Sequence, residues 1–348
     1  MFEFLALPKL IALIKNVYHG IMSIVVIIPL MFTMGQPSDP NTPVIPNENA
    51  QNAYINEYLD PDISAHRSGA GIAPQNTLMA FEYVLKEKAT LGVDTFEFDV
   101  QITSDGELIV LHNLTYDDTS NAVEAFGHKN VYASKLTYKE AYDVLNLGEN
   151  FTADGKTYPY RGLRGDKIPE NLRVAKCDDV IDYIEANSGD KEYRYIIEIK
   201  STGINGMKAA DKLYSIINER NLKDRVIWAT SLEDVSMYME HKYPDMPRSA
   251  RITEIIQFYI YSRMNWNLDD LNVSYIALQI PYGDNCANNL INLGTRELIN
   301  YAHKYDIAVQ YWTINEEEET ELLIKNGADC VMTDYPQMAY DIVKDLNK

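Results

Sequence analysis

The chain has few basic residues and few cysteines, and each shortage excludes a class of protein. Its 348 residues include 51 acidic and 31 basic side chains, for a formal net charge of −20. A surface of this sign repels a polyanion, so we expect no nucleic-acid partner. Cys177, Cys286 and Cys330 have no Cys-x-x-Cys spacing and are odd in number, which indicates neither a zinc site nor a disulfide framework.

Charge is also missing from residues 17–34, an apolar run close to the length that spans a bilayer. Lys9 and Lys15 precede this run, and no lysine or arginine follows it before Arg67. The positive-inside rule therefore predicts a cytoplasmic segment over 1–16, a transmembrane helix or signal anchor over 17–34, and an extracytoplasmic remainder. The alternative is a cleaved signal peptide and a secreted form, but an Ala-x-Ala site is lacking.

The next segment, residues 35–60, is rich in proline, asparagine and acidic residues, and its composition predicts a disordered tether. From residue 61 to 348, short β-rich runs alternate with helical runs, a pattern typical of βα units around a parallel sheet. Eight strands are expected, which fits a (βα)8 TIM barrel. They are Ile63–His66, Thr95–Thr103, Tyr195–Lys200, Arg225–Ala229, Arg248–Thr253, Tyr275–Gln279, Ala308–Thr313 and Cys330–Thr333. The stretch from about 113 to 174 interrupts this rhythm and is expected to be an insertion after the second strand.

Polar residues gather where these strands end, which is where active sites of such barrels form. Alternation along the second strand puts Glu97 and Asp99 on one face. Together with Glu198 on a later strand they offer three hard oxygen ligands, which suit one Ca²⁺ or Mg²⁺ ion better than zinc. The other polar or aromatic residues at predicted strand ends are His66, Lys200 and Trp312.

A series of short motifs, in one order along the chain, resembles the glycerophosphodiester phosphodiesterase family. No single motif is specific, but the ordered series is. The motifs are His66-Arg67, Pro74-Gln-Asn-Thr77, Glu97-x-Asp99, Asp105-Gly106 followed by His112, Glu198-x-Lys200, Trp312-Thr-x-Asn315 and Thr333-Asp334-x-Pro336.

The resemblance implies metal-dependent cleavage of glycerophosphodiesters to sn-glycerol 3-phosphate and an alcohol. Carried over by position, His66 and His112 are the general acid and base. Arg67 and Lys200 bind the phosphate, Trp312 forms a substrate wall, and the divalent ion sits on Glu97, Asp99 and Glu198. The insertion is then expected above the barrel mouth.

Several alternatives stay open. Lys200 could serve only as an ion-pair partner of Glu198, and Trp312 could be a packing residue. Gln75 and Asn113 replace acidic residues of the family pattern, which leaves the alcohol part of the substrate undefined. A lyase-like relative that releases a cyclic phosphate is a second enzymatic interpretation, and a non-catalytic envelope binding module is the alternative of another class.

Overall fold

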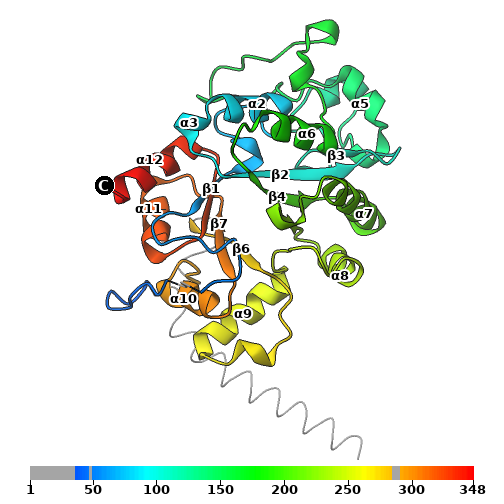
Figure 1. The fold of residues 1–348 in the computed structure, drawn as a ribbon. Helices are drawn as coiled ribbons and strands as arrows, with labels where there is room; N and C mark the ends of the chain where they lie inside the picture. Colours follow the sequence, from blue (N-terminus) through cyan, green and yellow to red (C-terminus); the bar gives the residue numbers. More distant parts are fainter. Residues whose placement is uncertain (1–35, 47–48, 284–290) are drawn as a thin grey trace, which may run out of the picture.

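Parallel strands form the centre of the chain in a computed structural model, which describes residues 36–46, 49–283 and 291–348 (Figure 1). Seven strands are neighbours in the order β5-β4-β2-β1-β8-β7-β6, and every neighbouring pair is parallel. An eighth, β3, pairs antiparallel with β2 outside this order. The strands are β1 (Asp62–Ala65), β2 (Thr95–Ile102), β3 (Leu108–Val110), β4 (Arg194–Ile199), β5 (Val226–Ala229), β6 (Ala277–Pro281), β7 (Ala308–Trp312) and β8 (Cys330–Thr333).

The two ends of this order, β5 and β6, are linked by a short extended segment. Arg248 bridges Trp228 of β5, and Ser249 bridges Ala277 of β6, both in parallel. The segment around them thus occupies the place of one further barrel strand, which makes the α/β fold consistent with a (βα)8 barrel.

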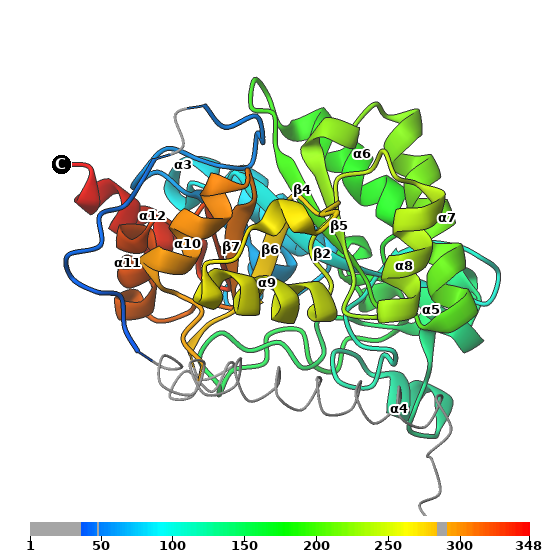
Figure 2. The ribbon, with the colours of Figure 1, turned by 90° about the horizontal axis from the view of Figure 1, so that it is seen from below.

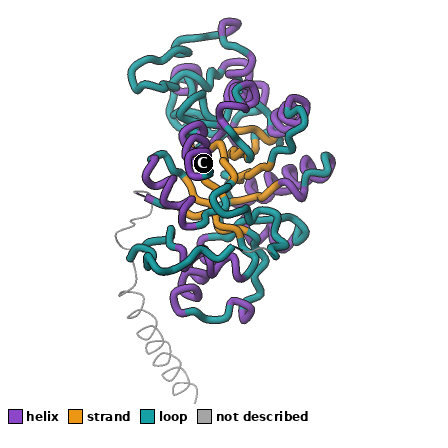
Figure 3. The backbone as a smooth tube through the Cα atoms, turned by 60° about the vertical axis from the view of Figure 1, so that its left-hand side comes forward, coloured by secondary structure: helices purple, strands orange, loops and turns teal. Residues whose placement is uncertain are grey.

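Helices surround the strands, as Figures 2 and 3 show. They follow the parallel strands in the alternation expected of βα units. The helices are α2 (Leu78–Lys86), α3 (Lys88–Leu91), α4 (Ala122–Phe126), α5 (Tyr138–Val144), α6 (Cys177–Asn187), α7 (Gly203–Glu219), α8 (Glu233–Lys242), α9 (Ile252–Met264), α10 (Arg296–Lys304), α11 (Glu317–Asn326) and α12 (Pro336–Leu346).

Alternation along the strands separates the apolar core from the barrel interior. On β2, Phe96 and Phe98 point outward into the apolar cluster shared with α2, α6 and α7. The intervening positions of β2 point inward. Near the base of the barrel a second, smaller cluster of side chains fills the interior, contributed by β4 to β8 and by the segment before β1: Tyr54, Ile196, Ile227, Ala277, Ala308 and Met332. The base is therefore closed by apolar packing, and the polar inward residues lie nearer the carboxyl ends of the strands.

Most strand predictions coincide with observed strands, but the one over Arg248–Thr253 is right only at its start and extends too far. Only Arg248 and Ser249 make strand bridges, and helix α9 already begins at Ile252. The helix starts there because the Glu254 side chain accepts a hydrogen bond from the backbone N–H of Arg251 at 2.9 Å. A carboxylate in the first turn satisfies an otherwise unpaired N–H group.

The predicted insertion forms a small unit with its own apolar core. It contains α4 and α5 with short 3₁₀ turns, and its core includes Tyr116, Leu145 and Val174. Leu114 and Tyr132 of this unit line a hollow together with Ser201, which follows β4. The insertion thus borders the carboxyl ends of the strands, the mouth of the barrel.

Residues 36–60, where described, pack along the barrel, whereas their composition predicted a disordered tether. Ser38 Oγ accepts a hydrogen bond from the N–H of Arg296 at the start of α10, and Thr42 Oγ1 donates to Glu297. Further along, the Asn52 side chain donates to the carbonyl of Ile276, just before β6. We call the described part of residues 36–60 the N-terminal arm. It runs beside α10 from the mouth side to the base, as the blue segment of Figure 2 shows.

The predicted membrane span over 17–34 lies outside the described residues. Among the residues that are described, no helix is both long and apolar enough to cross a bilayer.

Candidate active site

Three carboxylates converge inside the barrel, on the mouth side of the apolar layer. Glu97 and Asp99 lie on the inward face of β2, and Glu198 of β4 is the register partner of Asp99. Their ligand oxygens all lie within 4.8 Å of one another. Glu97 is 3% exposed and Asp99 is 1% exposed. Two buried carboxylates and the half-buried Glu198 at this spacing need compensating positive charge.

Two basic side chains supply part of that charge. Lys200 Nζ lies 2.6 Å from Glu198 Oε1 and 3.3 Å from Asp99 Oδ1. Arg67 Nε lies 3.7 Å from Asp99 Oδ2. Within the described residues Glu97 has no ion pair with a lysine or arginine side chain, and its Oε2 accepts a hydrogen bond from the Arg67 backbone N–H at 2.7 Å. The cluster therefore holds more carboxylates than cationic side chains.

The turn after β1 positions the first histidine and this backbone donor. Arg67, Ser68 and Gly69 have φ values of 49°, 61° and 85°, so the chain turns sharply in the left-handed region. His66 Nδ1 lies 2.7 Å from Asp334 Oδ1, and Asp334 Oδ2 accepts a hydrogen bond from the Asn315 side chain at 2.8 Å. When Nδ1 donates to Asp334, Nε2 of His66 remains available for proton exchange.

His112 follows β3 and is oriented by its neighbours in the insertion. Its Nδ1 lies 2.6 Å from Asn113 Oδ1, and the Asn113 amide donates to Asp118 Oδ2 at 2.5 Å. The His112 carbonyl accepts a hydrogen bond from the Gln101 side chain of β2. Asn113, a departure from the family pattern, thus acts together with Asp118: the amide contacts the ring and the carboxylate holds the amide.

Sequence reasoning assigned no role to several residues that support this site. Asn76 has a φ of 56° and is buried, and its side chain both donates to Asp99 Oδ2 and accepts from the Asp99 backbone N–H. Gln75 accepts a hydrogen bond from Arg67 at 2.7 Å. Asp334 and Asn315 orient His66 as described above. All four stand inside the motifs quoted from the sequence, so their motif positions were the signal that could have identified them.

Burial and neighbouring charge shift the pKa values of the three carboxyl groups in different directions. Burial, helped by the charge of Asp99, raises the pKa of Glu97 to about 7. Burial also raises the pKa of Glu198, although Lys200 opposes it. For Asp99 burial is outweighed by Lys200, His112 and Arg67, so its pKa falls below the usual range. The cluster thus binds protons at pH values where exposed carboxylates are ionised.

The two histidines shift in opposite directions. Burial lowers the pKa of His66, but the bond to Asp334 and the charge of Glu97 outweigh it, so its pKa lies above the usual value. Burial is the largest influence on His112 and leaves its pKa below the usual value, despite the attraction of Asp99. Opposite shifts in one site suit one proton donor and one proton acceptor.

The carboxylate cluster also fits a divalent cation. Oxygen ligands on adjacent rigid strands are the donor set that Ca²⁺ and Mg²⁺ take in proteins. Among the described residues, the Glu97 side chain accepts a hydrogen bond only from the backbone N–H of Arg67, and the three carboxylates outnumber the nearby cationic side chains, Lys200 and Arg67. Glu97, Asp99 and Glu198 are therefore the residues that could hold such an ion.

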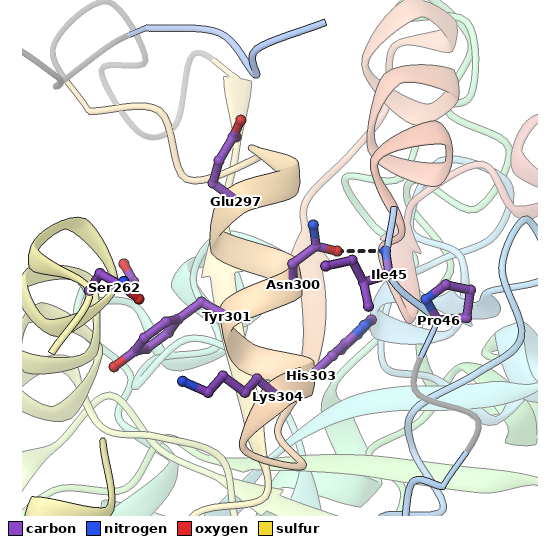
Figure 4. A pocket seen from close by; sticks show the side chains of 9 residues that line it. Ile45, Pro46, Ser262, Glu297, Asn300, Tyr301, His303 and Lys304 are labelled. Atoms are coloured by element: carbon purple, nitrogen blue, oxygen red, sulfur yellow. Dashed lines mark hydrogen bonds between the residues drawn. The ribbon is translucent and has the colours of Figure 1, made fainter. Parts of the chain in front are cut away.

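The last predicted site residue, Trp312, stands at the end of β7 and is 38% exposed. Its peptide bond to Thr313 is cis. Trp312 and Glu198 line the same cavity, so the structure brings the indole to the edge of the carboxylate cluster. Another cavity lies away from the strand ends, between the N-terminal arm and α10, where Asn300 accepts a hydrogen bond from Ile45 (Figure 4). It contains none of the predicted site residues.

Known proteins resemble this chain along most of its length. The sequence profile of the glycerophosphoryl diester phosphodiesterase family matches residues 66–338. A glycerophosphodiester phosphodiesterase of Caldanaerobacter subterraneus is 28% identical over 286 residues, which cover 81% of this chain and 97% of that protein.

Solved structures show a likeness of fold. A structure from Silicibacter pomeroyi is 22% identical, has a TM-score of 0.63, and is matched over 82% of this chain and 94% of its own. A phosphodiesterase of Oleispira antarctica, solved with its product sn-glycerol 3-phosphate, is 17% identical with a TM-score of 0.58 over 82% and 97% of the two chains.

Proposed function

This chain belongs to the glycerophosphoryl diester phosphodiesterase family and is a phosphodiesterase, and we propose that it hydrolyses glycerophosphodiesters to sn-glycerol 3-phosphate and an alcohol with the help of one divalent ion. The observation that carries this proposal is the carboxylate cluster of Glu97, Asp99 and Glu198, in which the charge of His66 lowers the pKa of Glu97 and the charge of His112 lowers that of Asp99. A bound Ca²⁺ or Mg²⁺ would supply Lewis acidity and neutralise phosphate charge.

The basic side chains are proposed to bind the phosphate. Lys200 forms ion pairs with both Glu198 and Asp99. Burial alone would lower the pKa of Lys200, but the two carboxylates outweigh it and raise this pKa, so the side chain stays protonated. Arg67 lies at the same cluster and is held by Gln75. Both cations would stabilise the negative charge that builds up on the phosphoryl oxygens.

The histidines are proposed to move the protons. His66, whose pKa is raised, donates a proton to the leaving alcohol oxygen. His112, whose pKa is lowered, accepts a proton from the nucleophile, which is water or the 2-hydroxyl of the glycerol. Attack by the hydroxyl would give a cyclic phosphate, so phosphorus NMR of the product distinguishes the two routes.

The test is release of choline and glycerol 3-phosphate from glycerophosphocholine by the full chain, with Ca²⁺, Mg²⁺ and a chelator series. We expect release that depends on the divalent ion and is lost in His66→Ala. His241→Ala, an exposed histidine of α8, is the matched control and should keep full activity. Metal binding without release from any diester would favour a non-catalytic envelope module instead.

For the location of the enzyme, we propose a membrane anchor over residues 17–34 with the barrel outside the cytoplasm. The support is the uncharged run and the distribution of lysine and arginine around it. Intact cells treated with a protease should lose the barrel from the membrane fraction. A barrel protected from protease in intact cells, or found in the medium, would contradict the anchored topology.

A further inference from the structure

Two glutamines form a polar pair inside the barrel, on strands across from the carboxylate cluster. Gln279 of β6 and Gln310 of β7 are register partners, and Gln279 Nε2 donates a hydrogen bond to Gln310 Oε1 at 2.9 Å. Gln310 is 2% exposed. Neither residue belongs to a motif of the family, and the proposed mechanism gives neither of them a task.

Strand periodicity places this pair at the level of the cluster. Ala277, two positions before Gln279, belongs to the apolar cluster at the barrel base. On β4 the same step of two residues leads from Ile196 of that apolar cluster to Glu198. Successive inward residues are two positions apart, so the glutamines and Glu198 are the first inward residues beyond the base. The interior of an eight-stranded barrel is narrow enough for side chains of facing strands to approach one another.

A cavity of about 380 Å³ connects the pair with the cluster. Glu198, Gln279 and Trp312 line it together, and its outer walls include the exposed isoleucines Ile252 and Ile256 of α9. The volume lies within the range of small-molecule sites. A small substrate that contacts the carboxylates can therefore reach the glutamine pair as well.

The pair leaves hydrogen-bonding groups unused. Each amide has one oxygen and one NH₂ group, so whichever glutamine donates within the pair, one amide oxygen and one NH₂ group remain. No other group of the described residues forms a hydrogen bond with these remaining atoms. An unpaired buried amide is costly, so these atoms need a partner from water or a ligand. A hydroxyl both donates and accepts and therefore suits them, whereas the oxygen of an ionised phosphodiester only accepts.

We propose that Gln279 and Gln310 bind the terminal hydroxyl of the glycerol moiety and so select substrates in which this hydroxyl is free. This inference rests on the proposed phosphodiesterase function and names two specificity-determining residues of that site. The 2-hydroxyl is next to the carbon that bears the phosphate, so it stays near the carboxylate cluster. The terminal hydroxyl is one carbon farther away and reaches the opposite wall. There the remaining NH₂ group donates to the hydroxyl oxygen, and the remaining amide oxygen accepts from its O–H.

The experiment compares three substrates of the full chain in the presence of the divalent ion. They are glycerophosphocholine, 2-hydroxypropyl phosphocholine, which lacks the terminal hydroxyl, and glycerophosphocholine methylated on that hydroxyl. All three keep the 2-hydroxyl, so both routes of attack stay open, and each releases choline. We expect kcat/KM to be about 10–100-fold lower for both analogues, because the amides lose a partner. The loss should lie mainly in KM, since the terminal hydroxyl is remote from the bond that breaks.

A double variant tests whether the glutamines make this preference. Gln279→Met with Gln310→Met keeps the length of both side chains and leaves no amide unpaired, so the fold should tolerate it, which its Tm checks. The ratio of kcat/KM for glycerophosphocholine to that for 2-hydroxypropyl phosphocholine should fall to within about threefold of one. Gln257→Met is the matched control, because Gln257 is exposed on α9 and does not line the cavity. That variant should keep the ratio of the unsubstituted enzyme.

The outcomes separate the two proposals. Equal kcat/KM for glycerophosphocholine and 2-hydroxypropyl phosphocholine in the unsubstituted enzyme overturns the inference about the glutamines and leaves the proposed function intact. A preference that persists unchanged in the double variant also overturns it, because other groups then bind the hydroxyl. No release of choline from any of these substrates would count against the proposed function itself.

Discussion

The raised pKa of Glu97 makes divalent-ion binding depend on pH in a predictable direction. Glu97 must lose its proton to become a ligand, and burial with the charge of Asp99 raises its pKa to about 7. Below that pH the proton competes with the ion. Apparent affinity for Ca²⁺ or Mg²⁺ should therefore weaken about tenfold for each pH unit below about 7.

The expected size of the effect follows from linkage. At about pH 5 only about one Glu97 in a hundred is ionised, so affinity is roughly a hundredfold weaker than at about pH 8. An ion concentration that is a hundred times Kd at about pH 8 stabilises the fold by ~2.7 kcal/mol, whereas near Kd the gain is only ~0.4 kcal/mol. For a barrel of this size those gains correspond to about 4–5 °C and less than about 1 °C in Tm.

The metal-free protein should show the opposite trend. A carboxyl whose pKa is raised on folding contributes stability while it is protonated, below its unfolded value of 4.5, and this is lost as pH rises through about 7. The loss approaches ~3 kcal/mol for Glu97. Without metal, Glu97→Gln should therefore lack this decline and be more stable than the unsubstituted protein at about pH 8.

Thermal unfolding with and without each ion, between about pH 5 and about pH 8, measures both effects. Glu149→Gln is the control, because Glu149 pairs with Arg164 in the insertion, away from the cluster. It should leave the pH dependence of the metal response unchanged. A metal-induced gain in Tm that is constant over this pH range, or that survives in Glu97→Gln, would refute the assignment of Glu97 as a ligand.

Three further substitutions test other parts of the structure. Asp334→Asn should lower kcat about 10–100-fold with little change in Tm. The limb of the pH–rate profile that reports His66 should move to lower pH, because a neutral amide no longer raises the pKa of the imidazole as the carboxylate does. An unchanged profile would show that the contact is only structural. Tyr54→Ala should destabilise the fold by ~3 kcal/mol in urea titrations, because this side chain of the N-terminal arm is 4% exposed and packs at the barrel base. If the arm were a freely moving tether, the substitution would cause no loss of stability. Gly92→Ala should cost more than ~2 kcal/mol in the same titration, since Gly92 has a φ of 61° and an added Cβ would lie 2.2 Å from Cδ2 of Tyr340; wild-type stability would contradict this close packing.

Local patterns predicted the parts of the site that depend on one strand at a time. Alternation along β2 determined that Glu97 and Asp99 share a face opposite Phe96 and Phe98, since successive side chains point to opposite sides. The rhythm of strands and helices likewise predicted the parallel sheet. The strand over Arg248–Thr253 was predicted too long, because its apolar and β-branched residues suit a strand as well as a helix, and capping by Glu254 favoured the helix from Ile252.

Contacts between distant segments were beyond such reasoning. Asp334 was visible as a motif residue, but nothing local to either residue says that it bonds His66, 268 positions earlier. The arm was misjudged for the same reason: a proline-rich composition indicates little local structure, and the bonds that order Asn52 or Ser38 come from helices and strands more than two hundred residues away.

The sequence by itself determined the βα rhythm, the shared face of the two β2 carboxylates and the motifs that identify the family, because these depend on periodicity and spacing along the chain. Only the tertiary structure decided that Glu198 lies beside Asp99 on the neighbouring strand, which partners orient His66 and His112, and where the isoleucines of α9 lie relative to the cluster. These features depend on strand register and on how the barrel closes. The physical reason is that pKa shifts and substrate grooves arise from distances between groups that are far apart in sequence, and only folding sets those distances.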